Sequence, residues 1–61
     1  MDEVFIKREI EKTKKYIEIN KYSKEDAIGF IKAKMEIAEH TGDEAILNSC
    51  KMLLEEYTNK D

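Results

Sequence analysis

The chain has 61 residues, so it holds one domain at most, and a domain of this size buries only about 60% of its unfolded surface. Its single cysteine excludes an intramolecular disulfide and a Cys-x-x-Cys metal motif. Charged residues make up 41% of the chain and interrupt the N-terminal segment within a few positions, which excludes a signal peptide and a membrane span and predicts a cytoplasmic protein.

The first predicted helix spans residues 2–19. Its apolar positions recur every three or four residues and form a narrow stripe that includes one threonine: Ile6, Ile10, Thr13 and Ile17. Phe5 and Tyr16 lie along one edge of this stripe, whereas Val4 and Ile19 point away from it. We expect Asn20 to end the helix, because asparagine tolerates the left-handed conformation found at helix C-termini.

The second predicted helix spans residues 24–40. Ser23 and Asp26 resemble a capping box at its start, and Gly42 is suited to end it. Its apolar arc is the widest in the chain, because Phe30 and Ile37 extend it on one side. This width predicts that the second helix lies in the middle of the fold.

The third predicted helix spans residues 43–58, with either Thr41 or Asp43 as its N-cap. It carries the clearest apolar stripe of the chain: Ile46, Leu47, Cys50, Leu53, Leu54 and Tyr57. Only two to four residues connect it to the second helix, so the two must form an antiparallel hairpin. The sequence therefore predicts an all-α fold, a single three-helix domain over residues 1–61 with the first helix packed across this hairpin.

The side chains that usually carry chemistry fit structural roles here. His40 lies on the solvent side near the end of the second helix, where a cation stabilises the helix dipole. Cys50 lies within the apolar stripe of the third helix and is expected to be a buried small hydrophobe rather than a reactive thiol. No nucleophile–base pair, phosphate-binding loop or convergent ligand set can be assembled, so we expect no enzymatic activity, cofactor or metal.

Charge is unevenly distributed along the chain. Residues 1–24 carry seven basic and five acidic groups, and residues 25–61 carry four basic and nine acidic groups. The first helix has five cations, interleaved with glutamates: Lys7, Arg8, Lys12, Lys14 and Lys15. A phosphate-binding stripe needs an unopposed positive field. Nucleic-acid binding through this helix is therefore the alternative reading rather than the favoured one.

Several large apolar side chains lie outside the stripes. They either wrap the sides of the core or form a patch for association. Lys34 lies within the apolar arc of the second helix, where it either extends its ammonium group to water or meets an acid across an intermolecular seam. The candidate interface consists of Phe5, Tyr16, Ile19, Tyr22, Phe30, Lys34 and Ile37.

The narrow first stripe, the surplus aromatic residues and the short chain together predict a homodimer, since two-fold pairing is the commonest closed assembly. The expected function is that of a small acidic regulatory protein that acts by protein–protein interaction, occupying a surface of another protein or of its own copy. Lysine outnumbers arginine ten to one, which is typical of an AT-rich genome. An inhibitor from a phage or mobile element would fit this composition.

Overall fold

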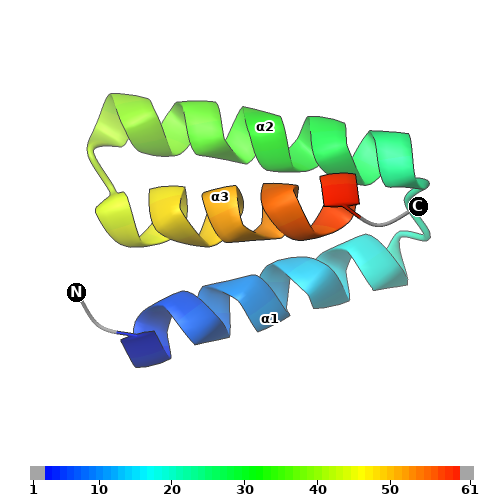
Figure 1. Cartoon of the computed structure of the whole chain (residues 1–61), viewed down its shortest axis with the longest axis horizontal. Coiled ribbons are helices and arrows are strands. Elements are labelled where there is room, and N and C mark those ends of the chain that lie inside the picture. The colour runs from blue at the N-terminus through cyan, green and yellow to red at the C-terminus, as the bar shows by residue number, and fades with distance from the viewer. Residues whose placement is uncertain (1–2, 60–61) are drawn as a thin grey trace.

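The computed structural model describes residues 3–59 and contains three α-helices, with no strand among those residues. They are α1 (Glu3–Ile19), α2 (Lys24–Thr41) and α3 (Glu44–Asn59). Figure 1 shows α2 and α3 side by side and antiparallel, joined by a tight turn. The all-α class and the hairpin are therefore confirmed, while residue 2, the predicted start of the first helix, lies outside the described residues. No helix among residues 3–59 is long and apolar enough to cross a membrane.

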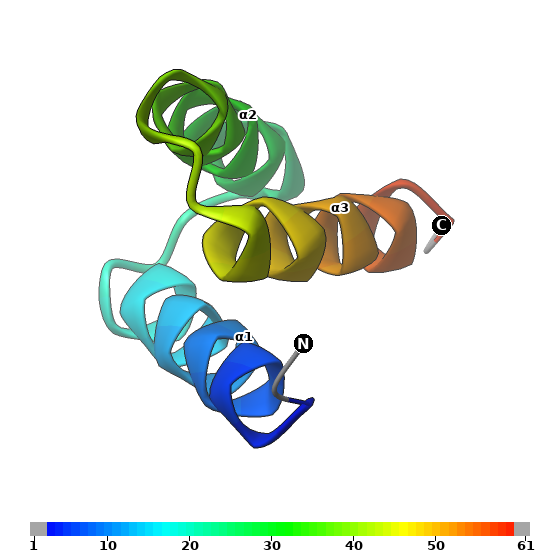
Figure 2. The same cartoon turned by 90° about the vertical axis from the view of Figure 1, so that its left-hand side faces the viewer.

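The helix in the middle of the fold is α3, not α2. In Figure 1, α3 lies between α2 and α1, and it is the helix that packs against both of them. The prediction for the second helix was wrong because the residues that widened its arc do not face α3. Phe30 stacks on Tyr16 of α1, and Ile37 is exposed. Seen from the end, α1 and α2 diverge and α3 packs against the pair from one side (Figure 2).

The buried core lies where α3 meets the other two helices. α3 contributes Cys50 and Leu53, α2 contributes Ala27 and Ile31, and α1 contributes Ile17. Thr13 of α1 is also buried although it is polar. The narrow stripe of the first helix therefore supplies few buried apolar groups, and α1 is held to the hairpin by a smaller apolar contact than the one that joins α2 to α3.

The residues expected to cap α2 and α3 occupy both ends of α2 and the start of α3. Ser23 Oγ accepts a hydrogen bond from the Asp26 backbone N–H at 3.1 Å and so caps the start of α2. Gly42 ends α2 in the left-handed conformation, with φ of 74°. Asp43 caps α3, because its Oδ1 accepts a hydrogen bond from the Ile46 backbone N–H at 3.2 Å. The Thr41 hydroxyl instead donates back to the Ala38 carbonyl, which decides between the two possible caps.

The end of α1 differs from the sequence-based expectation by one residue. The left-handed conformation belongs to Lys21, whose φ is 53°, and not to Asn20. Asn20 stabilises the helix end through its side chain, since its Nδ2 donates to the Tyr16 carbonyl at 2.8 Å. The backbone N–H groups of Lys21 and Tyr22 bond back to Glu18 and Ile17. A residue with a Cβ therefore occupies the position at which glycine is the most favourable residue.

Replacing Lys21 by glycine should consequently stabilise the protein. The left-handed conformation costs an L-residue about 1–2 kcal/mol, and the greater freedom of glycine in the unfolded chain offsets part of the gain. We expect the free energy of unfolding to rise by about 0.5–1 kcal/mol, measured by urea unfolding. Asn20→Gly is the control, because Asn20 has no positive φ and loses a hydrogen bond, so it should not stabilise. A loss of stability in Lys21→Gly would contradict this explanation.

Candidate interaction surface

The side of the α1–α2 pair that α3 does not cover carries most of the predicted interface. We call this surface the α1–α2 face. It is formed by residues that lie on this side of α1 and α2, as their spacing of three, four or seven positions indicates. They are Phe5, Glu9, Tyr16 and Ile19 of α1, and Phe30, Lys34 and Ile37 of α2. Since the backbones of α1 and α2 make few close contacts, long side chains connect the two helices.

Aromatic rings close one end of the α1–α2 face. Tyr16 stacks on Phe30 with ring centroids 5.1 Å apart, and Tyr22 meets Tyr16 edge-on at 6.1 Å. Phe30 and Tyr22 also pack against the core. For these two rings, the expectation that the extra apolar side chains wrap the sides of the core is therefore the one that holds. Burial raises the pKa of the Tyr22 phenol, and the neighbouring Tyr16 adds to this effect. The cluster fixes the α1–α2 connection while one ring, Tyr16, stays about half exposed.

The centre of the face is a polar contact between α1 and α2. Lys34 Nζ donates to Thr13 Oγ1 at 3.0 Å and lies 3.9 Å from Glu9 Oε1. The Lys34 and Glu9 side chains are 26% and 13% exposed, so the pair is largely withdrawn from solvent. The acid that pairs with Lys34 therefore belongs to the same chain. The alternative of an acid across an intermolecular seam is not needed to explain this lysine.

Both ends of the α1–α2 face leave large apolar side chains in solvent. Ile37 is 65% exposed, Phe5 is 41% exposed, and Ile19 beside the aromatic end is 73% exposed. Ile37 lies beside a shallow surface hollow that Ala33, Glu36 and His40 also line. These side chains do not wrap the core. Their exposure instead supports the expectation of an apolar patch that is available for association.

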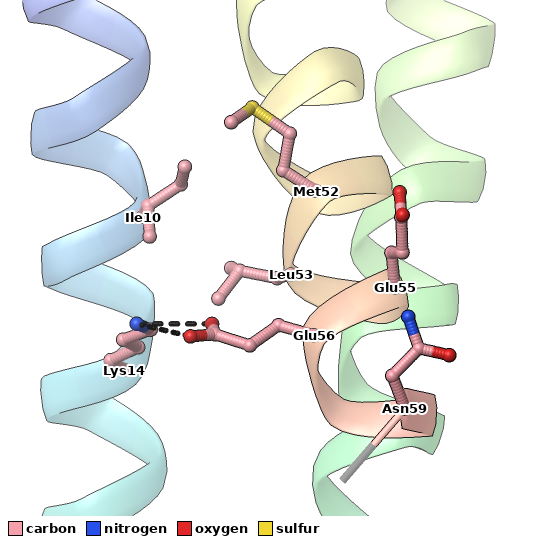
Figure 3. A pocket seen from close by; sticks show the side chains of 7 residues that line it. All are labelled: Ile10, Lys14, Met52, Leu53, Glu55, Glu56 and Asn59. Atoms are coloured by element: carbon pink, nitrogen blue, oxygen red, sulfur yellow. Dashed lines mark hydrogen bonds and ion pairs between the residues drawn. The ribbon is translucent and has the colours of Figure 1, made fainter.

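A second surface lies between α1 and α3 (Figure 3). It is an open groove of ≈ 460 Å³ whose floor includes Ile10 and Leu53. The Lys14 ammonium crosses it and meets the Glu56 carboxylate at 3.0 Å. Met52 lies along this groove and is more than half exposed. It is outside the apolar stripe of the third helix and was not among the candidate interface residues. The ion pair divides the groove, which makes it a poorer apolar surface than the α1–α2 face.

The histidine and the cysteine have structural surroundings in the fold. His40 is exposed near the end of α2, and its Nδ1 lies 3.3 Å from the Glu36 carbonyl oxygen. Cys50 is fully buried between α2 and α3. Burial raises the pKa of the Cys50 thiol, and the nearby Lys34 ammonium offsets part of this effect. Among residues 3–59, no three histidine, cysteine or acidic side chains gather as metal ligands would.

The burial of Cys50 gives a measurable expectation. A thiol reagent attacks the thiolate, which is both shielded and disfavoured here. Labelling in native buffer should be slower than labelling in denaturant at the same pH by a factor on the order of a thousand, because the reaction then waits for unfolding. Equal rates in the two conditions, followed by absorbance of the released chromophore, would show that Cys50 is accessible in the folded protein.

Comparison with models of protein families finds no match to this chain, and comparisons with curated proteins and with solved structures find none either.

Proposed function

We propose that this protein is a small, non-enzymatic interaction protein of the cytoplasm that regulates by covering a surface of another protein or of a second copy of itself. The observation that carries the proposal is the α1–α2 face, where Ile19 stays exposed beside the aromatic cluster and Phe5 and Ile37 stay exposed at the other end. Large exposed apolar side chains are the usual core of a protein–protein interface. A non-enzymatic role is supported by the burial of Cys50, the most nucleophilic side chain among the described residues.

The proposal is tested by comparing two exposed apolar residues that lie on different sides of the molecule. Ile37→Glu places a charge in the α1–α2 face, whereas Met52→Glu places one beside the separate α1–α3 groove, at an exposure of 56%. Tagged protein from each variant is used to capture binding partners from the native host. Loss of a captured protein with Ile37→Glu and its retention with Met52→Glu supports the proposal. Equal capture by both variants would move the binding site away from this face.

The alternative function, binding of nucleic acid by α1, depends on the exposed cations of that helix. One side of α1 is lined by four cations but also by Glu11 and Glu18. Lys14 is further occupied by its ion pair with Glu56. These carboxylates weaken the field that a phosphate backbone would meet. A mobility shift of duplex or single-stranded DNA or RNA at low salt, lost in Arg8→Glu, would favour this alternative over protein binding.

A further inference from the structure

We infer that the partner of the α1–α2 face is a second copy of this chain, with α1 of each copy lying over α2 of the other. This inference rests on the proposed function and names the partner. It requires that the face be complementary to itself, because a two-fold dimer uses the same surface on both copies. The charges that border the face on its two helices meet this requirement.

The border of the face on α1 is basic. Arg8 lies three residues from Phe5, and Lys12 lies four residues from Tyr16 and seven from Phe5, so both share the side of α1 that carries these rings. Both are exposed. The only carboxylate of α1 within the face itself is that of Glu9, which is paired with Lys34. We call Arg8 and Lys12 the basic rim.

The border of the face on α2 is acidic. Asp26 lies four residues before Phe30, and Glu36 lines the same surface hollow as Ile37. Both carboxylates are exposed. The one lysine of α2 within the face, Lys34, is occupied by Thr13 and Glu9. We call Asp26 and Glu36 the acidic rim.

A two-fold axis that lies in the face and runs along the helices exchanges the two halves of the face. The α1 half of one copy then lies over the α2 half of the other, and the basic rim meets the acidic rim twice. Because α1 and α2 run in opposite directions, Phe5 of one copy and Ile37 of the other lie at the same end where α1 of one copy covers α2 of the other (Figure 1). Any arrangement that places α1 over α1 would instead oppose like charges, which disfavours it.

The centre of the face does not oppose burial. Lys34 and Glu9 satisfy one another, and Lys34 Nζ has a further hydrogen bond to Thr13, so docking would not leave an unpaired charge. A standard interface buries about 800 Å² on each partner. The chain exposes 4658 Å², so one side of this small protein is large enough for such an interface.

The test reverses the sign of the charges on one rim at a time. Variant R8E/K12E makes the α1 rim acidic, and variant D26K/E36K makes the α2 rim basic. Each variant alone opposes like charges at both contacts, so we expect the Kd of self-association to rise at least about tenfold, measured by sedimentation equilibrium. An equimolar mixture restores opposite charges at both contacts, so heterodimers should form with a Kd near that of the wild type. The single chain R8E/K12E/D26K/E36K should also dimerise.

Circular dichroism checks that each variant retains its helices. If one of the double variants does not fold, the quadruple variant R8E/K12E/D26K/E36K still tests whether opposite charges on the two rims support dimerisation. A wild-type chain that sediments as a 7.2 kDa monomer at several hundred micromolar overturns the inference. So does a dimer that neither reversal weakens, or a mixture that fails to restore association. If the monomeric wild type still captures another protein in an Ile37-dependent manner, the inference fails and the proposed function stands.

Discussion

Replacing Leu53 by alanine should lower the free energy of unfolding by about 2–5 kcal/mol. Leu53 is 1% exposed and lies in α3, where that helix meets both α1 and α2. Truncation removes the burial of its isobutyl group and leaves a cavity that two rigid helices cannot easily close. Because small domains have only about 5–15 kcal/mol of total stability, the variant should melt at a much lower temperature, as measured by circular dichroism.

Two neighbours on α3 serve as controls for this prediction. Leu54 is only partly buried, so Leu54→Ala should cost less than Leu53→Ala. Met52 is more than half exposed, and Met52→Ala should change the free energy of unfolding by no more than about 0.5 kcal/mol. The expected order of destabilisation is therefore Leu53, then Leu54, then Met52. Equal effects at Leu53 and Met52 would mean that α3 presents a different face to the core.

Replacing Lys34 by alanine should lower the free energy of unfolding by about 1–3 kcal/mol, since the change leaves largely buried polar groups without their partner. The Lys34 ammonium is the hydrogen-bond donor to Thr13 and lies beside Glu9. Its loss leaves the Glu9 carboxylate, which is 13% exposed, without its ion-pair partner. The change also removes a lysine stem that lies between α1 and α2. Urea unfolding of the purified variant measures the effect.

Lys32→Ala is the matched control, because Lys32 is an exposed lysine on the same helix. It should be within about 0.5 kcal/mol of the wild type. A double variant, Glu9→Gln with Lys34→Met, removes both charges and keeps an apolar stem at position 34. It should recover part of the stability lost in Lys34→Ala, because no unpaired charge is left at Glu9. A Lys34→Ala protein as stable as the Lys32→Ala protein would show that the central contact contributes nothing measurable.

Local signals in the sequence predicted the helices and their ends well. Ser23, Gly42 and Asp43 make their capping hydrogen bonds within three or four residues of their own position, so the sequence around each contains nearly all the information required. The exception is Lys21, which takes the left-handed conformation in place of the more tolerant Asn20. Asn20 instead bonds to the Tyr16 carbonyl through both its backbone N–H and its side-chain Nδ2, and residue preferences alone do not reveal this.

The arrangement of the helices was less predictable from periodicity. The wide arc of the second helix could not show that Phe30 belongs to an aromatic cluster with α1 rather than to a contact with α3. The partner of Lys34 was equally hidden, because Glu9 and Thr13 precede it by more than twenty residues and only the packing of α1 brings them together. Apolar spacing states which side of a helix is buried, and it does not state which neighbour covers that side.

The candidate surface was predicted in part. Phe5, Tyr16 and Ile37 were singled out because they lie off the apolar stripes, and all three are exposed to a large degree. Phe30 and Tyr22 were singled out for the same reason but pack against the core. Rings at the border between core and surface have this mixed character, and sequence spacing does not separate the two cases.

Pairing of two copies through the α1–α2 face is tested most directly by a dilution series of ¹⁵N-labelled protein. If copies pair through this face, amide chemical shifts should change with concentration at Phe5, Tyr16, Phe30 and Ile37 and stay constant on the outer side of α3, at Lys51 and Glu55. Shifts that are independent of concentration throughout the chain, or that change mainly on the outer side of α3, would contradict it.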